Sequence, residues 1–164
     1  MSSLLIGAIT AITAALVLYT IGVFGERRSG TLSKHNVVLF WCGFVCDTTG
    51  TSIMTVIARS GSATGSSLHA ISGALAIVLM LVHAVWATVV IVRNDERGRA
   101  NFHRFSIVVW LFWLIPYVIG ILLGTPAIGA SDIVATCVAI VVVACVAGLL
   151  WLGDHRRAAS GEER

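Results

Sequence analysis

The sequence predicts an all-α membrane protein, a single bundle of five transmembrane helices over residues 1–164. Hydrophobic residues make up 57% of the chain and charged residues only 12%, whereas a soluble domain averages about 25% charged residues. Five apolar segments each approach or exceed the length of about 20 residues that crosses the hydrocarbon core. Because these segments do not alternate polar and apolar residues, helices are favoured over the strands of a membrane β-barrel.

Short polar connections separate the five expected spans, which cover residues 3–24, 36–58, 67–92, 103–123 and 132–152. Ten of the eleven Lys and Arg residues lie in the connections after the first and third spans and in the C-terminal tail; the other is Arg59. The positive-inside rule places those ten in the cytoplasm, so the N-terminus is expected outside and the C-terminus inside. Because these charges flank helices, no nucleic-acid partner is expected.

The four cysteines do not form a disulfide or zinc framework. Cys42 and Cys46 lie one turn apart in the second span, and Cys137 and Cys145 lie in the fifth. Inside apolar helices such residues are typical of small-residue packing. Thiolate metal binding is the alternative.

Two histidines share one face of the third span. His69 and His83 are 14 residues apart, a spacing that advances a helix about 21 Å and returns within about 40° of the same face. Small residues and Met80 lie between them on that face. Because ionisable residues inside a membrane are rare and usually functional, this face is a candidate site for a flat ligand. The alternative is that each imidazole only hydrogen-bonds a neighbouring helix.

His103, at the start of the fourth span, is the expected partner of His83 as a second axial ligand of a haem iron. The two residues lie at the same depth if the connecting hairpin turns near residue 93, and differ by four residues, about 6 Å, if it turns near residue 95. His69 and His35 are the alternative ligands. Trp86, Trp110 and Trp113 suit the walls of a porphyrin pocket, with ordinary packing or an interfacial belt as the alternative.

The second span carries a polar and small face on which Asp47 lies near mid-span. An ionised carboxylate there is costly, so it is expected to be protonated, paired or hydrated. Asp47 could accept a hydrogen bond from a ligating imidazole, carry protons, or bond a Thr or Ser of another helix. Met54 falls level with His69 if the hairpin turns near residues 61–62, which allows an outer His–Met haem site.

Three stretches resemble the haem-sensing membrane protein A (HsmA) family of small bacterial membrane proteins. They are HNVVLFWCGFVCDTTGTSIM (35–54), LHAISGALAIVLMLVHAVWATVV (68–90) and FHRFSIVVWLFWLIPYVIG (102–120). The resemblance covers slightly over half the chain and does not reach the first and last spans. It implies a bacterial cytoplasmic membrane protein that binds haem and acts in haem handling or oxidative-stress protection.

The expected function is therefore that of a membrane b-type haem protein with one or two haems, and of a cytochrome b-like redox protein more than a classical enzyme. The haem would be non-covalent, since the chain has no Cys-x-x-Cys-His motif. Three alternatives stay open: an electron carrier to a quinone or peroxide, a proton-coupled carrier built on Asp47 and the histidines, and a non-catalytic subunit of a membrane complex. The partners expected are lipid, haem, a quinone or membrane redox partner, and a second copy of the chain.

The orientation can be tested by cysteine accessibility. In a variant without its four native cysteines, Gly98→Cys places one thiol in the basic 93–104 connection. A membrane-impermeant maleimide added to intact cells should not label it, because this connection is expected in the cytoplasm. Ser62→Cys, in the connection expected outside, is the matched control and should be labelled. Efficient labelling at position 98 in sealed cells would reverse the orientation.

Overall fold

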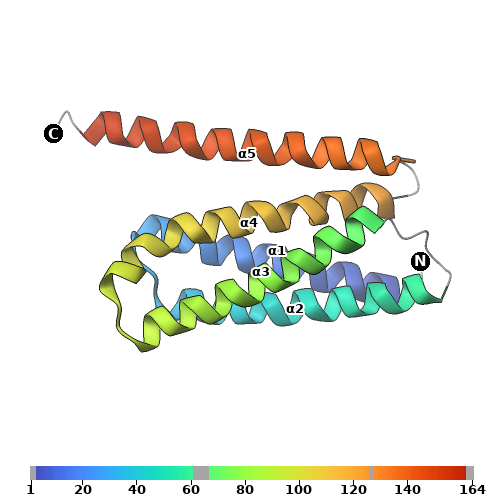
Figure 1. The fold of residues 1–164 in the computed structure, drawn as a ribbon, viewed down its shortest axis with the longest axis horizontal. Coiled ribbons are helices and arrows are strands. Elements are labelled where there is room, and N and C mark those ends of the chain that lie inside the picture. The colour runs from blue at the N-terminus through green and yellow to red at the C-terminus, as the bar shows by residue number, and fades with distance from the viewer. Residues whose placement is uncertain (1–2, 61–66, 126–127, 162–164) are drawn as a thin grey trace. The chain divides into compact units, whose positions relative to one another are not determined.

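The computed structural model describes residues 3–60, 67–125 and 128–161, which form five helices (Figure 1). They are α1 (Ser3–Ser29), α2 (Lys34–Arg59), α3 (Ser67–Val92), α4 (Glu96–Gly124) and α5 (Asp132–Gly161). Each is long and apolar enough to cross a membrane. The all-α class and the five expected helices are therefore confirmed, although the first, fourth and fifth extend beyond the spans expected at 3–24, 103–123 and 132–152.

The chain divides into two compact units, Met1–Trp113 and Leu114–Arg164. The first unit holds α1, α2, α3 and α4 as far as Trp113, and the second holds the rest of α4 together with α5. In the second unit Ile119 packs against Ala135 and Ala139 in a small core. The expectation of one bundle over residues 1–164 stays a prediction.

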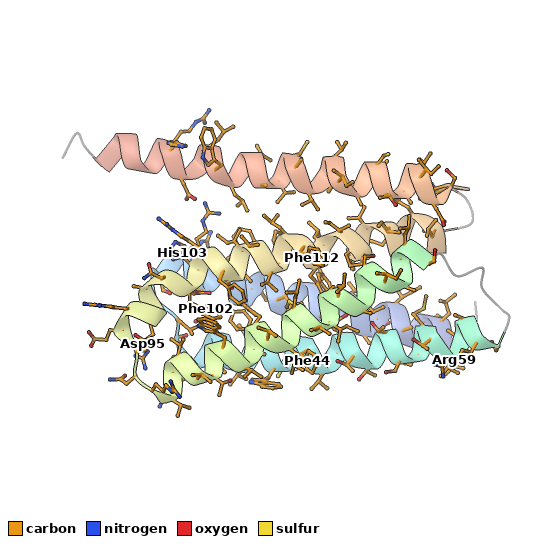
Figure 2. The ribbon with its side chains drawn as sticks, viewed as in Figure 1. Phe44, Arg59, Asp95, Phe102, His103 and Phe112 are labelled. Carbon is orange, nitrogen blue, oxygen red and sulfur yellow. The ribbon has the colours of Figure 1, made fainter. Side chains whose placement is uncertain are left out.

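The helices of the first unit alternate in direction, so the α1–α2 and α3–α4 turns lie at the same end (Figure 1). We call this the basic end, because Arg27, Arg28, Lys34, Arg93 and Arg97 lie in or beside its two turns. Figure 2 shows Asp95 at this end and Arg59 at the opposite one. Antiparallel neighbours joined by short turns are typical of helical bundles.

The α1–α2 turn is specified by local capping. Gly30 follows α1 with a φ of +69° and donates its N–H to the Glu26 carbonyl at 3.0 Å, a left-handed conformation that glycine adopts without strain. Ser33 and Asn36 form a reciprocal capping box at the start of α2. The Asn36 amide also donates to the Gly22 carbonyl at 2.9 Å, which ties α2 back to α1.

The α3–α4 turn is specified by two adjacent residues. Asn94 has a φ of +51°, and the Asp95 N–H donates to the Val90 carbonyl at 3.2 Å, as in the Schellman motif that ends many helices. The Asp95 carboxylate then accepts the Gly98 N–H at 3.0 Å and caps the start of α4. This chemistry fixes where α3 stops and α4 starts, and so which of their residues lie level.

Glycines allow α1 and α2 to approach closely. A Cβ added at Gly43 would lie 2.5 Å from the Tyr19 ring, and one at Gly22 would lie 2.5 Å from the Phe40 ring. Gly50 meets Ile12 in the same way. The small and polar face expected on the second span is therefore the face that α2 buries, apart from Met54, which is half-buried.

Replacing Gly43 with Ala should lower the free energy of unfolding by about 1–3 kcal/mol, because the added methyl overpacks against the Tyr19 ring. Unfolding of the detergent-solubilised protein by denaturant would measure the change. Gly7→Ala in α1 is the control. No atom lies within 4 Å of its added Cβ, so it should be neutral or stabilising by about 0.5–1 kcal/mol. Equal stability of the two variants would contradict the close packing of α1 on α2.

Candidate functional site

The buried polar and charged side chains of the described residues all lie in the first unit, and each is at most 4% exposed. They are Glu26, Asn36, Asp47, His83 and Ser106. Three of these five are ionisable, and no Lys or Arg is among them. Within the described ranges no group of three or more His, Cys, Asp or Glu side chains could hold a metal ion.

His83 is the buried imidazole of this set. Its side chain is 1% exposed, and its Nε2 lies 2.9 Å from the Ser106 Oγ of α4. Its Nδ1 has no hydrogen-bond partner within the described structure. Three phenylalanine rings surround the imidazole, with centroids 4.3, 5.1 and 5.9 Å away; they belong to Phe40, Phe102 and Phe105.

The face of α3 that carries His83 is the one expected from the sequence. Ala76, Met80 and Ala87 are buried along with it. His69, at the other end of the helix, is half-buried. The predicted stripe is therefore the packed face of α3 from Ala76 to Ala87, whereas a Cβ added at Gly73 would meet nothing within 4 Å.

The structure does not bring His103 to His83. The His103 Nδ1 lies 3.0 Å from the Ala100 carbonyl of its own helix, and the side chain is half-exposed. Phe102 lies between α3 and α4, whereas His103 lies on the side of α4 away from α3 (Figure 2). The turn at Asn94 and Asp95 makes Ser106 the residue level with His83 and leaves His103 three residues, about 4.5 Å, nearer the basic end.

This geometry bears on the fit of a haem. An axial ligand needs a free ring nitrogen and an open plane beside it. The Nε2 of His83 contacts Ser106, and Phe40 packs on the imidazole. The residues as arranged therefore do not place His83 and His103 together as a pair of axial ligands, and haem binding stays a prediction from the sequence.

The other residues expected near a haem are dispersed. Trp86 is 56% exposed, and His35 is also exposed. Trp110 is buried and donates its indole N–H to the Thr20 hydroxyl at 3.2 Å. Met54 is half-buried on α2. Of the expected aromatic walls, Trp110 thus links α4 to α1 by a hydrogen bond.

Asp47 lies inside the unit, as its position in the sequence suggested, but its partner is an indole instead of a hydroxyl or imidazole. The Trp113 Nε1–H donates to the Asp47 Oδ2 at 2.8 Å, and Asp47 is only 4% exposed. The Tyr19 ring meets Trp113 edge-on at 5.3 Å, and its buried hydroxyl makes no hydrogen bond in the described structure. An acid and a phenol therefore lie together in the core.

Glu26 was not anticipated from the sequence. It falls beyond residue 24, where the first span was expected to end, and beside two arginines it reads as a surface charge. The structure continues α1 to Ser29 and buries Glu26 completely, and neither carboxyl oxygen has a hydrogen-bond partner among the described residues. The missed signal was the helical spacing of Ala15, Tyr19, Gly22 and Glu26, all buried on one stripe.

Comparison with known proteins does not identify the chain. No family model matches it, and no curated protein or solved structure matches it. The resemblance to the HsmA family therefore stays a prediction based on the three stretches of sequence.

Ser106→Ala should lower the free energy of unfolding by about 1–3 kcal/mol, because it leaves the buried His83 Nε2 without a partner. Denaturant titration of the solubilised protein would measure this. Ser52→Ala, at an exposed position of α2, should change the stability by about 0.5 kcal/mol or less. If both substitutions were equally mild, the His83–Ser106 hydrogen bond would not contribute to the packed core.

Proposed function

We propose that this chain spans the cytoplasmic membrane with its basic end inside, and that it moves protons through its first unit. The observation that carries this proposal is Asp47, a carboxyl 4% exposed near the middle of the 26-residue apolar helix α2. Its one described hydrogen bond comes from an uncharged indole. This is the proton-coupled alternative among the functions considered from the sequence.

The cost of burial favours proton chemistry at this carboxyl. A carboxylate in an apolar interior is strongly disfavoured unless it is paired or neutralised. Binding a proton neutralises Asp47 without any partner ion. The neighbouring Tyr19 hydroxyl can both donate and accept a proton, and it is buried with no hydrogen bond to any described residue.

His83 supplies a second proton-bearing group nearer the basic end. His83 lies nine residues, about 13 Å along the helix, from Val92 at the end of α3. Asp47 lies thirteen residues, about 20 Å along the helix, from Lys34 at the start of α2. An imidazole can receive a proton on one nitrogen and release one from the other. From the basic end toward the middle of the first unit, His83 and then Asp47 are thus buried side chains that can hold a proton.

Proton movement can be measured in vesicles. Purified protein reconstituted with an internal pH dye should acidify or alkalinise the lumen faster than protein-free vesicles when a potassium diffusion potential is imposed. Asp47→Asn should reduce this rate to that of protein-free vesicles, because an amide cannot take up and release the proton. Asp132→Asn, at an exposed acid of α5, should keep the parent rate.

Two results would refute the proposal. One is a parent protein whose vesicles change pH no faster than empty ones. The other is an Asp47→Asn protein that matches the parent. Circular dichroism and gel filtration of each variant would show that the substituted protein is folded before its rate is compared.

A b-type haem is a second proposal, carried by the HsmA resemblance and by the buried imidazole of His83 with its unpaired Nδ1. As a haem or redox protein, the chain would work with a quinone or a membrane redox partner. The arrangement of Ser106 and Phe40 around the ring weighs against it.

The visible spectrum of the detergent-purified protein tests the haem proposal directly. A haem protein would show reduced-minus-oxidised bands that His83→Ala removes and that His155→Ala, at an exposed position of α5, leaves unchanged. A protein without haem absorbance, isolated from haem-supplemented cells, would reject this second proposal and leave proton movement unaffected.

A further inference from the structure

The outer side of the α3–α4 hairpin carries an exposed tryptophan that neither the packed core nor the proposed proton movement uses. The Trp86 ring of α3 and the Phe105 ring of α4 have centroids 5.8 Å apart and planes 34° apart. Trp86 is 56% exposed, and Phe105 is half-buried. Val82 and Val89, one turn to either side of Trp86, are 45% and 42% exposed. The two rings therefore join α3 to α4 within an apolar surface of the first unit.

An arginine lies beyond this apolar surface on the α3 side. Arg93 directly follows α3 and keeps a helical hydrogen bond, its N–H donating to the Val89 carbonyl at 2.9 Å. It is seven residues after Trp86, a spacing that returns to within about 20° of the same face about 10 Å nearer the basic end. Arg93 is exposed. Its guanidinium thus lies at the basic end of the face that carries Trp86.

The α4 side carries a matching stripe. Arg97, Asn101 and Phe105 follow one another at intervals of four residues, so they lie along one side of the helix. Arg97 and Asn101 are exposed. Arg104, seven residues after Arg97 and also exposed, repeats the Arg97 face. From the aromatic pair to the basic end, this side of α4 therefore changes from apolar to cationic.

The acids of the α3–α4 turn do not neutralise these arginines. No described acid forms an ion pair with Arg93 or Arg97. The Asp95 carboxylate accepts the Gly98 N–H at 3.0 Å. Glu96 is five residues before Asn101, which places it about 140° around α4 from the stripe. The guanidinium groups can therefore hold a phosphate, which arginine binds through paired N–H···O bonds.

We propose that this surface of the hairpin binds one anionic phospholipid of the cytoplasmic leaflet. The inference rests on the proposed span across the membrane and does not depend on proton movement. Arg93, Arg97 and the Asn101 amide hold the phosphate group, and the acyl chains lie over Trp86 and the neighbouring valines. A phosphate without acyl chains would match only the cationic part, so the exposed apolar part assigns the ligand as a lipid.

Lipid retained by the detergent-purified protein, counted by native mass spectrometry, tests this site. Protein mixed with equal amounts of dioleoyl phosphatidylglycerol and dioleoyl phosphatidylcholine should retain one molecule of the anionic lipid per chain in preference to the zwitterionic one. The double variant Arg93→Gln, Arg97→Gln should bind it about 25-fold more weakly, since each basic residue near anionic lipid contributes about fivefold. Arg28→Gln, at an exposed position of α1 at the same end, is the matched control and should keep the parent affinity.

The apolar part of the site has its own variant. Trp86→Ala should also weaken retention of the anionic lipid, whereas Trp151→Ala, which removes a 61% exposed tryptophan of α5, should not. Excess inorganic phosphate should leave the lipid bound, because phosphate alone makes no apolar contact. Circular dichroism and gel filtration would show that each variant is folded before its lipid is counted.

Three outcomes would overturn the inference. Equal retention of the two lipids, or an Arg28→Gln loss as large as that of the double variant, would mean that the basic end attracts anionic lipid without a site. Displacement by inorganic phosphate would make the arginines a phosphate site instead of a lipid site. Either result leaves proton movement standing, whereas a chain recovered from the soluble fraction of cells would overturn the membrane span and this inference together.

Discussion

The close approach of α1 to α2 is the constraint on which the rest of the first unit depends. It is made by aromatic and aliphatic side chains that lie directly over glycines, Tyr19 over Gly43 and Phe40 over Gly22. At this spacing the buried stripe of α1 and the buried stripe of α2 face one interior. Glu26 and Asp47 belong to those stripes, so the packing that joins the helices also encloses two acids.

The α3–α4 hairpin adds the remaining groups, and its register decides their chemistry. The left-handed Asn94 and the capping carboxylate of Asp95 set the turn. A turn at this position makes Ser106 level with His83 and directs a hydroxyl to the imidazole. A turn about two residues earlier would have brought His103 to the same level. The position of this one turn thus decides whether His83 pairs with a hydroxyl or with a second histidine.

Enclosing acids and an imidazole without cationic partners is unfavourable for folding, because each loses water without an equivalent replacement. The two unbonded oxygens of Glu26 are the clearest case. Buried ionisable groups that lower stability in this way are typical of functional sites, where the group is retained for the proton it carries. The aromatic rings around His83 and the indoles that bond Asp47 and Thr20 line that interior with largely apolar groups.

The sequence by itself determined five apolar helices, their approximate ends, the buried faces of α2 and α3, and the interior place of Asp47 and His83, because span length and helical periodicity are local properties. Tertiary structure decided the partners. Whether His83 lies level with His103 or with Ser106 depends on the residues at which the α3–α4 hairpin turns. The sequence predicts that turn position only to within about two residues. Glu26 escaped notice because the end of an apolar run does not mark the end of a helix, and only packing against α2 and α4 shows that its charge lies inside.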